Sequence, residues 1–261
     1  MGHQRLGRLP ATRNWRAVIA LITEGSDAAN IAAATAEAAE GSLRAAAKDP
    51  TLRDVFFLLT QIPLAARSSD FAQALYDLDI VTVSQPNLIE IVTALTETLD
   101  RKMATQEATN DFSEMASKAA IESLFDVASR EGLGLLGASH GPDEARAVLH
   151  QLAIPRQFGV LARDFVSRLI RSCISYYLSR ELPNHVGGNS RFRSIKEHDQ
   201  FVTAVDLHCR ETSRIVEQFA SEWFSKANFE GGITREKAGG FIHVAFQKVV
   251  KELRARHVTH A

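Results

Sequence analysis

Residues Arg156–Lys226 read RQFGVLARDFVSRLIRSCISYYLSREL, then PNHVGGNSRFRSIKEHD, then QFVTAVDLHCRETSRIVEQFASEWFSK. Apolar residues recur every three or four positions in the first and last of these parts, which predicts two long helices. The apolar stripe of the first part is wide, so we expect that helix to be largely buried. Between the helices we predict a long polar loop, Pro183–Asp199.

The rest of the chain repeats the helical pattern. Helix-period apolar stripes are separated by short Gly, Pro and Ser boundaries, and the one β-like run, Asp79–Val83, is too short and isolated to imply a sheet. We therefore predict an all-α bundle of about nine to ten helices. It would consist of a basic arm over residues 1–13, an N-terminal helical part over 14–131 and a C-terminal helical part over 142–261. Whether the two parts are one domain or two is left open.

Composition sets the broad class of protein. The chain has 261 residues, 45% of them hydrophobic and 23% charged, and its net charge is −1. These values are typical of a soluble globular chain with no global field for nucleic acid or membrane. Residues 1–130 hold 12 basic and 17 acidic residues, and residues 131–261 hold 18 and 14, so the halves differ modestly in sign. With no signal segment and no spanning apolar run, we expect a cytoplasmic protein without membrane contact.

Recognisable catalytic motifs are missing from the sequence. Gly132–Gly137 matches G-x-G-x-x-G but follows a helical pattern, so we interpret it as a hinge and predict no cofactor. His208 and Glu211 are spaced to share a helix face, yet a core histidine explains His208 better than a metal ligand does. We therefore predict no catalytic residue and no metal ligand.

The loop is the best candidate surface for binding. Its glycines can expose backbone N–H groups, its arginines can hold phosphate or carboxylate, and its phenylalanine offers an aromatic face. The alternative is a mobile connection that pins Phe192 and Ile195 onto the bundle. The candidate residues are His185, Asn189, Arg191, Phe192, Arg193, Lys196 and His198, with Arg5, Arg8 and Arg13 in the basic arm.

Three functions follow as hypotheses. The first is a non-enzymatic helical subunit or adaptor that binds other protein subunits or a second copy of itself. Its docking surfaces would be the alanine-rich segment Asp27–Lys48 and the pair Gly239–Gly240, and a multi-gene bacterial system such as antiviral defence is a guess about its context. The second is binding of nucleic acid or a nucleotide phosphate through the arm and the loop. The third is a metal-dependent enzyme around His208.

Overall fold

The fold is all-α, as predicted. The computed structural model describes residues 9–41, 43, 48–105, 111–132 and 141–258. Within those ranges the chain has no strand, and its one isolated β-bridge joins Val186 to Phe192. The helices are α1 (Arg13–Thr23), α2 (Ala28–Ala38), α4 (Pro50–Ala65), α5 (Phe71–Tyr76), α6 (Leu88–Ala104), α7 (Asp111–Gly132), α8 (Pro142–Leu152), α9 (Pro155–Leu178), the 3₁₀ turn η1 (Leu182–His185), α10 (Ile195–Thr212), α11 (Ile215–Phe229) and α12 (Arg235–Val258).

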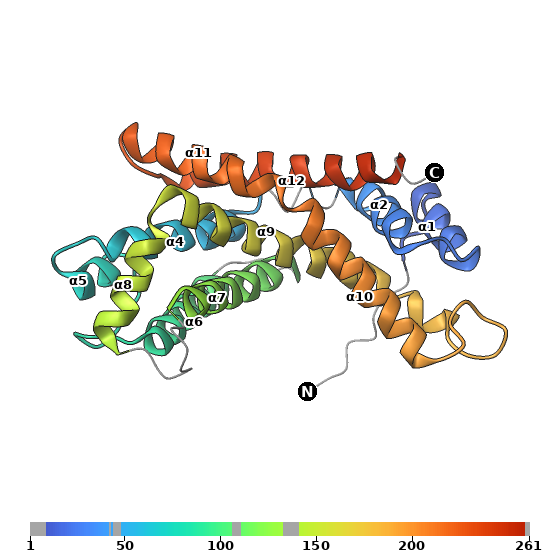
Figure 1. Cartoon of the computed structure of the whole chain (residues 1–261), viewed down its shortest axis with the longest axis horizontal. Helices are drawn as coiled ribbons and strands as arrows, with labels where there is room; N and C mark the ends of the chain where they lie inside the picture. The colour runs from blue at the N-terminus through green and yellow to red at the C-terminus, as the bar shows by residue number, and fades with distance from the viewer. Residues whose placement is uncertain (1–8, 42, 44–47, 106–110, 133–140, 259–261) are drawn as a thin grey trace.

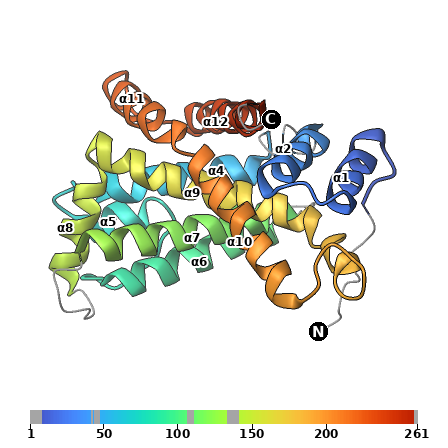
Figure 2. The same cartoon turned by 45° about the vertical axis from the view of Figure 1, so that its right-hand side comes forward.

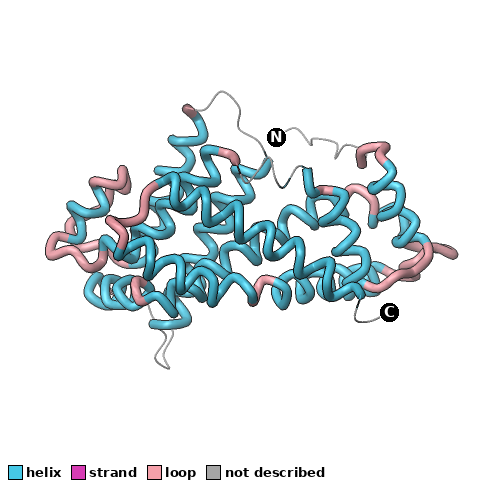
Figure 3. Tube along the Cα trace, turned by 90° about the horizontal axis from the view of Figure 1, so that it is seen from above, coloured by secondary structure: helices cyan, strands magenta, loops and turns pink. Residues whose placement is uncertain are grey.

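The bundle is elongated, and α9 lies at its centre (Figure 1). This helix packs against α7 and α11 and also contacts α10, α2 and α8. Helices α11 and α12 lie along one long side, with α6 and α7 on the opposite side (Figures 1 and 2). Helix α5 lies at one end of the long axis and α1 at the other. Seen from above, helices fill the length of the molecule and loops gather at its ends (Figure 3).

An aromatic cluster joins the N-terminal and C-terminal helices. Phe56 of α4 stacks on Phe241 of α12 with ring centroids 4.9 Å apart, and Phe158 of α9 stacks on Phe224 of α11 at 4.0 Å. The buried apolar residues of helices α1 to α12 belong to one contiguous cluster. The two helical parts expected from the sequence therefore share a core.

The segment after the loop differs from the sequence prediction. We expected one helix after Asp199, but the structure has α10 and then α11. The Oγ1 of Thr212 donates to the carbonyls of His208 at 2.9 Å and Cys209 at 3.0 Å, and the Oγ of Ser213 donates to Cys209 at 2.7 Å. Hydroxyls that bond back to carbonyls in this way compete with the helix, so α10 ends here.

The small residues of α2 are used inside the molecule rather than offered to a partner. Ala32, Ala36 and Ala39 are at most 2% exposed, because α2 packs against α1, α10 and α12. Of the glycine pair in α12, a Cβ on Gly239 would contact the side chain of Arg53, and one on Gly240 would meet open space. The alanine face of α2 is therefore covered by the chain's own helices, whereas Gly240 is exposed and docking there stays a prediction.

An ion-pair network connects α7 with α9. The Arg168 guanidinium of α9 pairs with Asp164 on its own helix and with Glu122 and Asp126 of α7, which fixes these two helices together. Hydrogen bonds to these three carboxylates raise the pKa of Arg168 against the opposing effect of burial. Among the helices drawn from the described ranges, none is long and apolar enough to cross a membrane.

Candidate functional site

The predicted loop is shorter and more ordered than the sequence suggested. Helix α10 already begins at Ile195, where the Ser194 hydroxyl accepts the N–H of Glu197, so residues 195–199 are helical. Before it, the N–H of Gly187 donates to the carbonyl of Phe192 at 2.7 Å, and the N–H of Phe192 donates to His185 at 3.0 Å. Gly187 and Gly188 have φ values of +93° and +58°, which side chains with a Cβ rarely adopt. The region is thus a closed turn.

Arg191, predicted to bind an external anion, binds the chain itself. Its guanidinium donates to the carbonyls of Ile22 at 3.0 Å and Leu21 at 3.4 Å, and also to that of Ser26. These carbonyls belong to the end of α1 and the turn after it, and those of Leu21 and Ile22 also accept the backbone N–H groups of Ser26 and Gly25, at 3.0 and 3.3 Å. Burial lowers the pKa of Arg191, and the nearby charge of Asp27 opposes that shift. Arg191 therefore caps α1.

Phe192 is a core residue rather than an exposed aromatic face. Its side chain is only 4% exposed, and its ring lies 5.3 Å from that of Phe201 on α10. The guanidinium of Arg191 lies over both rings, 5.1 and 4.6 Å from their centroids. The alternative interpretation, a connection that pins Phe192 and Ile195 onto the bundle, is right for Phe192 and wrong for Ile195, which is 71% exposed.

The two histidines at the edges of the predicted loop each face a carboxylate. The Nε2 of His185 lies 2.9 Å from an oxygen of Glu181, and the Nδ1 of His198 lies 3.1 Å from Asp199. The His198 ring also meets the Phe192 ring edge-on at 5.6 Å. Both histidines thus border the closed turn from opposite sides of Phe192.

The remaining candidates on this surface are Asn189, Arg193 and Lys196, and all three are exposed. The backbone N–H of Arg193 donates to a carboxylate oxygen of Glu197 at 2.8 Å. Within the described ranges, neither the Arg193 guanidinium nor the Lys196 ammonium has an ion-pair partner. The structure thus leaves two free cations, flanked by acidic residues, where the sequence suggested a full phosphate site.

The other candidates from the sequence are the basic arm, the glycine motif and the proposed metal site at His208. Arg5 and Arg8 lie outside the described residues, as do residues 133–137 of the glycine motif, and Arg13 is the exposed first residue of α1. In the described parts of the chain, no three His, Cys, Asp or Glu residues are grouped to hold a metal ion. His208 therefore gains no support as a ligand.

The thiols of Cys173 and Cys209 are buried in the packing of α9 and α10. Burial raises the pKa of the Cys173 thiol, and it raises that of Cys209 to about 12. Both residues therefore stay as neutral, poorly nucleophilic thiols near neutral pH.

Capping by a distant cation, as at Arg191, recurs in three other places. Arg67 donates to the carbonyl of Ala153 at the end of α8 at 2.6 Å, and Arg146 donates to Ala66 at the end of α4 at 3.3 Å. Lys237 donates to the carbonyl of Gly232 at 2.8 Å, just beyond α11. A cation at a helix C-terminus both bonds the free carbonyls and opposes the helix dipole. The sequence carries no signal for these contacts, because each cation lies on a different element from the helix end it caps.

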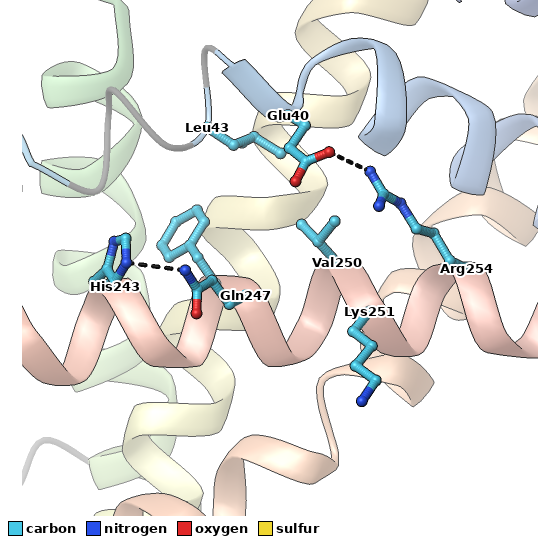
Figure 4. A pocket seen from close by; sticks show the side chains of 8 residues that line it. Glu40, Leu43, His243, Gln247, Val250, Lys251 and Arg254 are labelled. Carbon is cyan, nitrogen blue, oxygen red and sulfur yellow. Dashed lines mark hydrogen bonds and ion pairs between the residues drawn. The ribbon is translucent and has the colours of Figure 1, made fainter.

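A cavity of about 350 Å³ lies between α12 and the segment after α2 (Figure 4). Leu43, Phe246 and Val250 contribute its apolar wall. Arg254 pairs with Glu40 across it at 2.5 Å, and Lys251 points away from Glu40 (Figure 4). The charge of Arg254 is thus compensated by Glu40 within the lining.

An apolar surface near α5 was not anticipated from the sequence. Tyr76, Val81 and Val83 are 62%, 59% and 55% exposed, and we call these three residues the Val81 patch. Beside it is a hollow of about 420 Å³ whose lining includes Tyr76, Val81, Arg101 and Lys102. In the sequence, the β-like run Asp79–Val83 was the one indication of this surface. A run that joins no sheet has no neighbouring strand to help bury its valines.

Asp79 holds the chain in place beside this patch. Its φ is +67°, a left-handed conformation that a non-glycine residue keeps only when its surroundings enforce it. Thr98 Oγ1 and the Arg101 guanidinium donate to its carbonyl at 2.8 and 3.0 Å, and the Lys102 ammonium lies 2.9 Å from its carboxylate. The hydrogen bond and charge of Lys102 lower the pKa of Asp79. Helix α6 thus fixes the start of the exposed segment.

Comparison with models of known protein families, with curated proteins and with solved structures found no match for this chain. The functional assignment therefore depends on the surfaces described above.

Proposed function

We propose that the chain is a non-enzymatic helical subunit or adaptor, and that it binds a partner protein through the Val81 patch. The observation that supports this proposal is the exposure of three large apolar side chains, each more than half accessible, two of which, Tyr76 and Val81, line a hollow. Exposed apolar side chains that gather next to a hollow are typical of protein interaction sites. Tyrosine is also one of the residues that contribute most to binding energy at interfaces.

The position of the patch also favours a docking role. One of its residues, Tyr76, is the last residue of α5, and α5 lies at the opposite end of the long axis from α1 (Figure 1). A partner bound there would leave the long sides of the bundle open to further subunits. This geometry suits a chain that joins proteins within a larger assembly.

Paired surface variants test the proposal. Val81→Ser with Val83→Ser removes the apolar side chains of the patch, whereas Ile195→Ser with Leu207→Ser removes two others that are 71% and 57% exposed on α10. The unaltered chain and each variant are tagged and expressed in the protein's native host. The amount of each co-purified protein is then compared between the variant and the unaltered chain. We expect the patch variant to lose a specific partner by about tenfold or more, since removing buried apolar contacts costs one to several kcal/mol. The α10 variant should retain it.

Two outcomes would refute the proposal. In one, light scattering shows a monomer at every concentration and the unaltered chain retains no specific protein. In the other, a specific partner is retained equally by the unaltered chain and the patch variant.

A further inference from the structure

The backbone of Val81, Thr82 and Val83 is unpaired. Among the described residues, none of their N–H or C=O groups takes part in a backbone hydrogen bond, although Ile80 donates to Leu75 at 3.0 Å. The residues after them bend towards Asn87, the N-cap of α6. Three consecutive residues thus have free donors and acceptors on the surface of a helical protein, where other backbone groups are satisfied by helices and caps.

Burial alternates along this segment. Ile80 is fully buried, Val81 is 59% exposed, Thr82 is partly buried with its hydroxyl oxygen inaccessible, and Val83 is 55% exposed. A period of two is the signature of extended backbone, in which successive side chains point to opposite faces. The segment therefore has the shape of a single β-strand that lacks a neighbour.

Both ends of the segment are fixed. At its start, Asp79 is held by Thr98, Arg101 and Lys102 of α6, as described above. At its end, Asn87 and Glu90 form a capping box in which each side chain accepts the other's backbone N–H, at 3.0 and 2.8 Å. A strand that is already positioned at both ends loses little further conformational entropy when it binds.

The hollow beside the strand carries an uncompensated positive charge. Lys102 is paired with Asp79, but Arg101 donates only to the Asp79 carbonyl and to the Thr98 hydroxyl. No acidic side chain in the described ranges forms an ion pair with Arg101. Of the charged residues that line the hollow, one cation is therefore left for an acidic group of a ligand.

From these observations we infer that Val81–Val83 receives a strand from a partner protein. The occupant is an extended peptide with apolar side chains at alternate positions and an acidic side chain that reaches Arg101. Its main chain supplies the hydrogen bonds that residues 81–83 lack, and its side chains pack on Val81 and Val83. Strand addition of this kind takes affinity from the backbone and specificity from alternate side chains. The inference rests on the proposed function, because it names the form of the partner that binds the same surface.

Peptide selection followed by a proline scan tests the inference. A random library of short linear peptides is first depleted of those that bind the variant Val81→Ser, Val83→Ser. The peptides that then bind the unaltered full chain are selected. Each of residues 81, 82 and 83 is then changed to proline, which removes the backbone N–H, and separately to alanine, which keeps it. In an extended strand the N–H groups of Val81 and Val83 point to one edge and that of Thr82 to the other.

The expected result is a period-two pattern in peptide affinity. We expect proline to weaken peptide binding about tenfold relative to alanine on one edge of the strand only, which means either at positions 81 and 83 or at position 82. One lost hydrogen bond is worth about 1 kcal/mol, and the proline ring also blocks the approach of the peptide. Arg101→Met weakens binding of peptides that contain an acidic residue, whereas Lys118→Met, which alters an exposed cation of α7, leaves their affinity unchanged. Thermal unfolding of each variant confirms that it is folded.

Three results would overturn the inference: helical or proline-rich selected peptides, proline variants that bind like their alanine counterparts, or an equal loss at all three positions. The proposed function is judged separately, by the side-chain variants of the patch. If partner binding depends on the valine side chains but not on the backbone N–H groups, the adaptor role is supported and strand addition is refuted. If no partner depends on the valines, the adaptor role itself fails.

Discussion

Arg191 and Arg193 are separated by a single residue, yet their surroundings give them different roles. Arg191 is partly buried and donates to three carbonyls at and beyond the end of α1, whereas the side chain of Arg193 is exposed. A guanidinium fits a phosphate and a set of backbone carbonyls equally well, because both present converging acceptors. Residue type alone therefore cannot separate binding from capping, and the fold decides between them.

Replacing each arginine by methionine measures this difference. Arg191→Met keeps an aliphatic stem but removes the guanidinium hydrogen bonds to the carbonyls of Leu21, Ile22 and Ser26, although the first two keep backbone donors. We expect it to lower the free energy of unfolding by about 1–3 kcal/mol. Arg193→Met should change that free energy by less than about 0.5 kcal/mol, as is usual for an exposed side chain. Urea denaturation of both variants checks the prediction, and equal stabilities would show that the α1 cap is not needed.

At the scale of helices, the closest approach is between α9 and α11. A Cβ built on Gly159 would lie 2.5 Å from the carbonyl oxygen of Glu217 and 2.3 Å from the hydroxyl of Ser221. Backbone cannot move aside as a flexible side chain can, so the glycine sets the spacing of this pair. The stacked rings of Phe158 and Phe224, on the same two helices, depend on that spacing.

Two glycine-to-alanine changes test the role of this contact. Gly159→Ala should destabilise the protein by about 1–3 kcal/mol, since overpacking forces the helices apart. Gly240→Ala is the matched control, because Gly240 lies within α12 and its added Cβ meets open space. There we expect a gain of about 0.5–1 kcal/mol from lower chain entropy and higher helix propensity. Thermal unfolding that shifts both variants in the same direction would contradict this account.

At the scale of the whole molecule, one core links the two parts of the chain. Helix α12 packs against α4 and α2, and α9 packs against α7. The N-terminal and C-terminal helical parts therefore bury their apolar faces against each other. We infer that they unfold together, since helices of each part bury apolar faces against helices of the other.

The two tryptophans can report on this cooperation. Trp15 lies in α1 beside Tyr177, and Trp223 lies in the aromatic cluster of α11. In the variants Trp15→Phe and Trp223→Phe, the remaining tryptophan reports on one part of the chain. We expect fluorescence and circular dichroism to give one coincident urea transition in each variant, as for a two-state protein. Two separated transitions would instead show two domains that unfold independently.

The candidate site was only partly predictable from the sequence. The extended character of Asp79–Val83 was visible, because its β-branched residues contrast with the helical pattern around them. Its exposure was not visible, because that depends on the turn that α6 imposes at Asp79. The loop before α10 shows the converse: its glycines indicated a turn, but the burial of Phe192 required α10 beside it.

By itself, the sequence determined the all-α class, the wide apolar stripe of α9 and most helix starts. These features follow from local periodicity and from caps that lie within a few residues of each other. Only the tertiary structure decided which cations are free, which small residues are buried and which apolar side chains stay exposed. Arg191, Arg146 and Arg67 each cap another element, and the valines of the Val81 patch lie outside the core. Such contacts join residues far apart in the chain, so packing between helices fixes them, and no local pattern encodes them.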